Sequence, residues 1–217
     1  MLAAMSRLRT ILCRPCSVAF LAACLFSQAV IQAADPAADA PVAKDPALRR
    51  ELLEMVRVDQ EMRRILMTKG QQAQQAELEK CVAIDRRNTA RTKEIVNAHG
   101  WPGKTLVGAD GAHAAWLLVQ HADFDAEFQA ACLSLLEEAV KRGEAAAVDA
   151  AYLVDRVRVN QKKPQVYGTQ FRLKDDGTYE PQPIEVPEHV DERRRSVGLG
   201  TLAEYAKLIG KPPQPAK

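Results

Sequence analysis

The segment between Trp116 and Asp125 constrains the fold of this chain most. It begins as an apolar helical pattern and ends abruptly in Gln120, His121 and Asp123. A helix that is apolar nearly all round is buried in the core of a domain. Burying the polar groups at its end costs a few kcal/mol each unless they find hydrogen-bond partners. The segment therefore predicts a buried helix with a polar site at its C-terminal end.

A second helix offers Asp155 and Arg156 as partners for this site. They belong to Tyr152–Val157, in which Tyr152 and Arg156 are i,i+4 neighbours and form a polar ridge. The guanidinium of Arg156 suits a carboxylate or phosphate ligand, and Asp155 projects about 100° away around the helix. The alternative for Arg156 is an interior salt bridge. Its candidate partners are Asp59, Asp85 and Asp191.

Tyr167 and Gln170 are candidates from a segment with the alternation of a strand, Gln165–Gln170. A glycine inside a strand often marks a bulge or a close approach by another group. Gln170, beside Gly168, is therefore expected to meet a ligand through a gap in the side-chain cover. The alternative is a glutamine that bridges a hairpin and a helix.

His121 is the candidate acid–base group. The negative end of a helix dipole favours an imidazolium ion, and a nearby carboxylate acts in the same direction. We expect His121 to act as a general acid or base that Asp155 orients. The alternative is local: Asp123 caps the helix that follows, and His121 satisfies a free backbone carbonyl.

Three further residues are assigned to the rim of the ligand site. Asp59 and Arg63 are i,i+4 neighbours on the first long helix, where the alternative is a solvated helix face. Trp101 follows a tight turn at His99-Gly100 and offers its ring to a ligand, the alternative being a place in the core.

The N-terminal segment predicts export. Three arginines up to Arg14 precede the apolar run Ser17–Phe26, and small residues follow as far as Ala34. These are the parts of a secretory signal peptide, residues 1–33, with cleavage after Ala33 or Ala34. The run is too short to span a membrane, which takes about 20 apolar residues. We expect a periplasmic or secreted protein.

Cys24 supports an alternative to this processing. Leu21-Ala-Ala-Cys24 resembles a bacterial lipobox, in which the cysteine carries the lipid anchor. The residues that follow Cys24 remain apolar, where a lipoprotein has a polar tether.

Export changes the charge balance. Removing residues 1–33 removes three arginines and no acidic residue, which leaves 27 basic and 28 acidic side chains. A net charge of −1 gives no electrostatic case for nucleic acid as a partner. Cys81 and Cys132 remain, and they form either one disulfide bridge or two buried thiols.

The rest of the chain predicts a mainly α, bundle-like domain with one small β-hairpin near residues 165–180. Residues 34–46 and 210–217 read as a flexible linker and a disordered tail around a single domain, 47–209. An Asp-Gly turn at 176–177 closes the hairpin. The expected helices cover residues 48–66 (ended by Gly70), 72–98, 109–122, 124–141, 145–160, 188–196 and 201–208.

No metal or nucleophile motif is present. The histidines and their neighbouring carboxylates lack a spacing such as His-Glu-x-x-His, and His113 and His189 have the surroundings of surface residues. Ser134 and Ser196 lack the context of a nucleophile elbow. We expect no metal site and no cofactor.

The polar motifs resemble those of an uncharacterised, mostly exported bacterial domain family, domain of unknown function 6624. The resemblance covers Leu48 to Tyr205 and implies that these motifs belong to one shared design, without implying a reaction, cofactor or substrate. They are Asp59-Gln-x-x-Arg63, Asp85-x-x-Asn88, Gly100-Trp-Pro102, Val107-Gly108, Ala115–Asp123, Tyr152–Val157, Gln165–Gln170 and Val197-Gly-Leu199.

The sequence thus predicts an exported protein with a central polar pocket that binds a small-molecule or envelope ligand. One hypothesis is an envelope hydrolase or lyase. The other is a non-catalytic binding or interaction module whose polar cluster is partly structural, since satisfied buried networks specify folds.

Overall fold

Helices build most of this computed structural model, which describes residues 43–69, 73–174 and 176–209. The long helices are α2 (Pro46–Lys69), α3 (Gln75–His99), α4 (Lys104–Gln120), α5 (Ala126–Lys141) and α6 (Ala147–Asn160). The shorter elements are β1 (Phe171–Leu173), β2 (Tyr179–Pro181), η3 (Pro187–His189), α7 (Val190–Ser196) and α8 (Leu202–Ile209). The mainly α fold with one small hairpin is confirmed.

The first described helix begins inside the predicted linker. Asp45 caps α2, because its Oδ1 accepts from the backbone N–H groups of Ala47 at 3.1 Å and Leu48 at 2.9 Å. Pro46 then fits the first helical position, which needs no N–H donor. The predicted signal peptide with Cys24, residues 34–42, Gly70 and the tail 210–217 lie outside the described residues.

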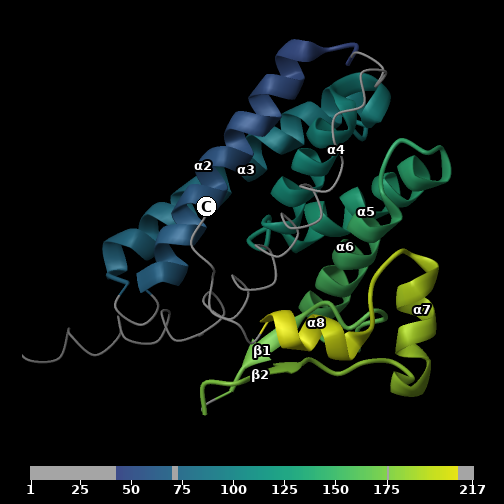
Figure 1. The fold of residues 1–217 in the computed structure, drawn as a ribbon. Helices are drawn as coiled ribbons and strands as arrows, with labels where there is room; N and C mark the ends of the chain where they lie inside the picture. Colours follow the sequence, from purple (N-terminus) through teal and green to yellow (C-terminus); the bar gives the residue numbers. More distant parts are fainter. Residues whose placement is uncertain (1–42, 70–72, 175, 210–217) are drawn as a thin grey trace, which may run out of the picture.

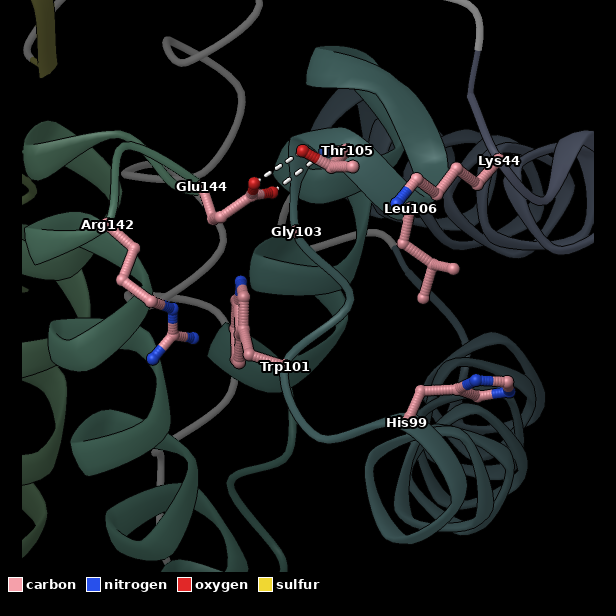
Figure 2. Close-up of a pocket in the computed structure, with 8 residues that line it drawn as sticks. All are labelled: Lys44, His99, Trp101, Gly103, Thr105, Leu106, Arg142 and Glu144. Atoms are coloured by element: carbon pink, nitrogen blue, oxygen red, sulfur yellow. Dashed lines mark hydrogen bonds between the residues drawn. The ribbon is translucent and has the colours of Figure 1, made fainter.

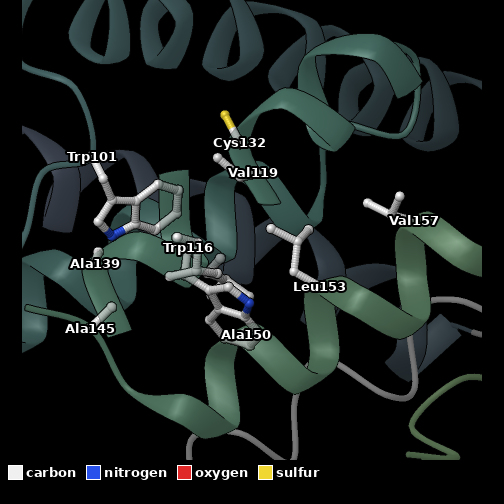
Figure 3. Close-up of a cluster of buried hydrophobic side chains, with 11 residues drawn as sticks. Trp101, Trp116, Val119, Cys132, Ala139, Ala145, Ala150, Leu153 and Val157 are labelled. Carbon is white, nitrogen blue, oxygen red and sulfur yellow. The ribbon is translucent and has the colours of Figure 1, made fainter. Parts of the chain in front are cut away.

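Helix α4 occupies the centre. It contacts α2, α3, α5 and α6, and Figure 1 shows the α2–α3 pair and the α5–α6 pair on different sides of it. Two apolar clusters use different faces of α4. Trp116, Leu117 and Val119 pack with α5 and α6 (Figure 3), while Ala115 and Leu118 pack with α2 and α3. The prediction of a buried helix before His121 is therefore correct.

The ends of α4 and α5 differ from the prediction. Gly108 interrupts α4 with φ 76° and ψ 167°, so a short helical turn at Lys104 precedes the predicted helix, which runs on from Ala109. Asp125, not Asp123, is the N-cap of α5, and its side chain accepts from the N–H of Phe128. Asp123 instead pairs with a buried arginine.

The strand pairing is shorter than the alternation predicts. Strands β1 and β2 are antiparallel and pair Phe171 with Pro181 and Leu173 with Tyr179. The preceding residues 165–170 do not extend β1; Gln165 forms an isolated bridge with Ile184. Side chains accept from most of their backbone N–H groups instead, those of Val166, Tyr167, Thr169 and Gln170.

A series of aromatic contacts connects the hairpin to α4. Phe171 packs edge-on against Tyr205 of α8, Tyr205 against Tyr152 of α6, and Tyr152 against Trp116. The imidazole of His113 lies 4.8 Å from the Trp116 ring, and its Nδ1 is 3.0 Å from Asp149 Oδ1. The prediction that His113 is a surface residue is wrong, because its side chain is only 22% exposed.

Among the described helices, none is both long and apolar enough to cross a membrane.

We expect Gly168→Ala to destabilise the protein more than Gly143→Ala. Both glycines have positive φ (68° and 75°), which costs an alanine about 1–2 kcal/mol. A Cβ at Gly168 would also lie 2.9 Å from Leu202 and 3.0 Å from Ile184, whereas Gly143 has no atom within 4 Å of that position. Overpacking adds about 1–3 kcal/mol. Urea unfolding measures both variants, and equal losses of stability would contradict this packing.

Candidate functional site

His121 lies in a buried charged cluster that joins three helices. We call Asp59, Arg63, Asp85 and His121 the His121 cluster. The Nδ1 atom of His121, the C-cap residue of α4, lies 2.9 Å from Asp59 Oδ2 on α2. Arg63 Nε donates to Asp59 Oδ1 at 3.1 Å, and Arg63 Nη2 donates to Asp85 Oδ1 of α3 at 2.5 Å. The i,i+4 pair Asp59 and Arg63 therefore faces the core and not the solvent.

The geometry favours a proton on His121 Nδ1. Arg63 Nε also lies 3.1 Å from this nitrogen, but a guanidinium only donates hydrogen bonds. An Nδ1 atom without a proton would turn its lone pair toward the Asp59 carboxylate. With the proton on Nδ1, both His121 and Arg63 donate to Asp59, and the negative charge is satisfied from both sides.

The two carboxyl groups of the His121 cluster have opposite pKa shifts. Burial alone would raise the pKa of Asp59, but the charge and hydrogen bond of His121 together with the charge of Arg63 leave it lowered. Burial raises the pKa of Asp85 to about 6, since the nearby Arg63 and His121 compensate only in part. Asp85 therefore exchanges its proton close to neutral pH.

Three buried amide side chains accompany the His121 cluster. Gln60 donates to Asp59 at 2.8 Å, Asn88 follows Asp85 by three residues, and Gln120 precedes His121. In the described part of the chain, Gln60 Oε1, both amide atoms of Asn88 and Gln120 Oε1 have no hydrogen-bond partner. Such atoms are rare in folded proteins. They are the feature of this cluster that the fold alone does not explain.

Arg156 belongs to a second polar cluster, where the α4–α5 loop meets α6. Its Nη1 atom donates to Asp123 Oδ2 at 3.1 Å. Gln129 of α5 donates to the carbonyls of Val119 and Gln120, and it accepts from Asn160 at 2.8 Å. The salt bridge expected as the alternative for Arg156 exists, but Asp123 is its partner, because this loop folds back over α6.

Asp155 does not occupy the predicted place beside His121. Its Oδ1 accepts from the N–H groups of Val166 and Tyr167, and its Oδ2 accepts from the N–H and hydroxyl of Thr169. Asp59 takes the position beside His121 instead. The physical reason is geometric: Asp155 projects from α6 toward residues 166–169, where a turn of backbone presents its donors.

Gln170 and Tyr167 belong to this same turn. Gln170 is fully buried, with its Nε2 bound to Thr169 Oγ1 and its backbone bound to the side chain of Gln165. The expected gap beside Gly168 is not there, because Leu202 and Ile184 fill it. Tyr167 is half-buried, and burial raises the pKa of its hydroxyl. The structure thus separates Gln170 and Tyr167 from the His121 cluster.

Arg194 is a buried residue that the sequence does not reveal. It donates to the carbonyls of Tyr167 at 2.8 Å and Gly200 at 2.6 Å. It is the middle one of three consecutive arginines on α7, and its neighbours are exposed or half-buried. A run of like residues gives no signal for which member turns inward.

Trp101 lies at the opposite end of α4 from His121. It lines a cleft together with residues of the α5–α6 turn and of the segment before α2 (Figure 2). The predicted ligand-binding residues therefore fall into separate regions of the fold.

Both described cysteines are free and buried. Cys132 packs with α4 and α6, whereas Cys81 packs with Met62 and Leu66 of α2. Burial raises the pKa of Cys81 to about 11 and that of Cys132 to about 12. The alternative of two buried thiols is the correct one. In the described part of the chain, no group of three or more His, Cys, Asp or Glu side chains is placed to hold a metal ion.

We expect Asp85→Asn to gain stability relative to the wild type as the pH rises from 4 to 7. The Asp85 pKa rises from 3.8 to about 6 on folding, so its favourable contribution is complete below pH 3.8 and is lost as the pH passes 6. The loss amounts to at most about 3 kcal/mol, at about 1.4 kcal/mol per pKa unit. Asparagine does not titrate and keeps an oxygen for Arg63.

Urea unfolding at several pH values measures this difference, and Asp110→Asn is its control. The hydrogen bond and charge of Arg49 lower the Asp110 pKa, so its contribution is already present above pH 4 and the control should show no such gain. A difference between Asp85→Asn and the wild type that stays constant with pH would contradict the prediction.

The comparisons with known proteins identify a family whose function is unknown. The model described as "Family of unknown function (DUF6624)" matches residues 46–212, which is most of the chain. No curated protein and no solved structure matches it. The resemblance seen in the polar motifs is thereby confirmed, and the chain belongs to the DUF6624 family.

Proposed function

We propose that this protein is an exported bacterial binding module without catalytic activity, and that its His121 cluster serves the fold. One observation carries the proposal. His121 is 5% exposed and Asp59 is 1% exposed. The two side chains are hydrogen-bonded to each other, and Arg63 also donates to Asp59. A general base has to reach the proton that it removes from a substrate. Groups that are shielded and bound to one another in this way are better suited to holding helices together.

Asp155 supports the same proposal. The sequence predicts that Asp155 orients His121, but its carboxylate accepts from the backbone N–H groups of Val166, Tyr167 and Thr169. These bonds organise a turn and leave no carboxylate oxygen directed at a reacting group. Both residues predicted to carry catalysis therefore have structural partners.

A hydrolase or lyase is the second candidate, and one observation favours it. The contact between His121 Nδ1 and Asp59 is the arrangement that orients a histidine for proton transfer, and the Asp85 pKa of about 6 lies near a working pH. The unpartnered atoms of Asn88 and Gln120 would then contact a polar substrate. Because the site is enclosed, this candidate requires an opening between α2, α3 and α4.

We expect His121→Ala to lower the melting temperature by at least about 6 °C. The substitution leaves Asp59 buried with part of its charge uncompensated, and breaking a buried pair costs about 3–5 kcal/mol. In a domain of this size 1 kcal/mol corresponds to about 2–4 °C. Calorimetry of the mature protein measures the change.

The control for this experiment is His189→Ala, since the His189 side chain is 63% exposed. It should change the melting temperature by less than about 2 °C. If His121→Ala instead matches or exceeds the wild type in stability, the enzyme candidate replaces the binding module, because active-site residues are often kept at the expense of stability.

We also propose that residues 1–33 direct export and are removed. The support is the sequence alone: basic residues, a short apolar run and small residues before Ala34. Mass spectrometry of the protein from the envelope of a bacterial host is expected to find Ala34 or Asp35 at the N-terminus. A lipid-modified Cys24 at the N-terminus would show that the lipoprotein alternative is correct.

A further inference from the structure

A cleft of about 290 Å³ lies at the N-terminal end of α4 (Figure 2). Three distant segments build it: the residues before α2, the turn between α3 and α4, and the turn between α5 and α6. Its volume is near the lower end of the range for small-molecule sites, which is about 300–1,000 Å³. The lining residues are Lys44, His99, Trp101, Gly103, Thr105, Leu106, Arg142 and Glu144.

Backbone contacts hold the three segments in fixed positions. The N–H of Lys104 donates to the carbonyl of Glu144 at 2.9 Å, and the N–H of Lys44 donates to the carbonyl of Thr105 at 3.2 Å. A Cβ at Gly103 would lie 2.6 Å from Glu144 Oε2, so the two turns approach as closely as glycine permits. The cleft is therefore part of the packed fold.

The charged side chains that line the cleft differ in whether they already have partners in the protein. Glu144 accepts from the backbone N–H of Thr105 at 2.8 Å and from its hydroxyl at 2.5 Å, and these bonds lower its pKa. Its carboxylate thus satisfies the N-terminal end of α4. Arg142 and Lys44, in contrast, have neither an ion pair nor a side-chain hydrogen bond within the described chain, and the Arg142 charge only helps to lower the pKa values of the nearby Glu144 and Glu138. Two cations remain available to an anion from outside.

Trp101 has a polar atom without a hydrogen-bond partner among the described residues. The side chain is only 7% exposed, and its Nε1 is buried with no hydrogen-bond partner in the described chain. Figure 2 shows the Arg142 guanidinium directed toward the Trp101 indole, while the His99 imidazole turns away. Because the Nε1 atom itself is covered, a ligand in the cleft would meet the indole ring and not its N–H.

We infer that this cleft binds a small organic carboxylate with one apolar face. The carboxylate contacts Arg142, and Lys44 contributes its positive charge. The apolar face lies against Trp101 and Leu106. This inference rests on the proposed binding function and gives it a ligand class and a place.

The test uses benzoate as the carboxylate and benzamide as its neutral equivalent of the same shape. The protein has two tryptophans, so each indole N–H gives one cross-peak in a nitrogen–proton NMR spectrum. We expect benzoate to shift the Trp101 peak in a saturable manner, with the Trp116 peak as the internal reference. Benzamide should produce little shift.

Two charge variants make the test specific. Arg142→Gln removes an exposed side chain without a partner in the described chain, and it should weaken benzoate binding about threefold or more. Arg195→Gln, at an exposed position on α7, should leave the affinity unchanged. Equal binding of benzamide, equal effects of the two variants, or no saturable shift of the Trp101 peak would each overturn the inference.

The failure of this inference and that of the proposed function are distinguishable. The proposed function depends on the melting temperature of His121→Ala, at the other end of α4. If benzoate does not bind in the cleft, the melting temperature of His121→Ala still tests the proposed function. If His121→Ala has unchanged stability, benzoate binding still tests the cleft.

Discussion

Helix α4 packs against α2, α3, α5 and α6, and its second half, residues 111–120, lies almost entirely in the core. This half of the helix gains apolar contacts on all faces, but its last carbonyls lose water, and the first N–H groups of α4 also lack partners within the helix. Other elements have to supply their partners. Glu144 binds the N-terminal end, and Gln129 binds the carbonyls of Val119 and Gln120 at the C-terminal end. Both partners come from α5 or the turn after it, which explains why this helix hairpin packs where it does.

A second constraint organises the C-terminal part of the fold. Residues 165–170 lie between a buried carboxylate and a buried guanidinium. Asp155 accepts from three backbone N–H groups of this segment, and Arg194 donates to the carbonyl of Tyr167. Buried charges are costly unless hydrogen bonds satisfy them, so each charge specifies one conformation of the segment. The backbone groups used in this way are not available for a strand, and β1 therefore starts only at Phe171.

The sequence predicts the elements well and their contacts poorly. The nearly uniform apolar character of residues 109–122 identifies the buried helix, and the Asp-Gly turn identifies the hairpin, because both signals are local. The partner of His121 is not a local property. Asp59 lies 62 residues away along the chain, and its i,i+4 pairing with Arg63 looks the same on a solvated helix as on a buried one. Likewise, Asp123 and Asp125 are equally good caps until the path of the loop is known.

The charged side chains near the two ends of α4 differ in how they are compensated. At the C-terminal end, the guanidinium of Arg63 and the carboxylates of Asp59 and Asp85 meet within the core and compensate one another. At the N-terminal end, Glu144 is bound by the helix, and Arg142 forms no ion pair within the described chain. A charge that the protein compensates contributes to the fold. We propose that the Arg142 cation, which lies beside Trp101 in the cleft, is available for recognition at the N-terminal end of α4.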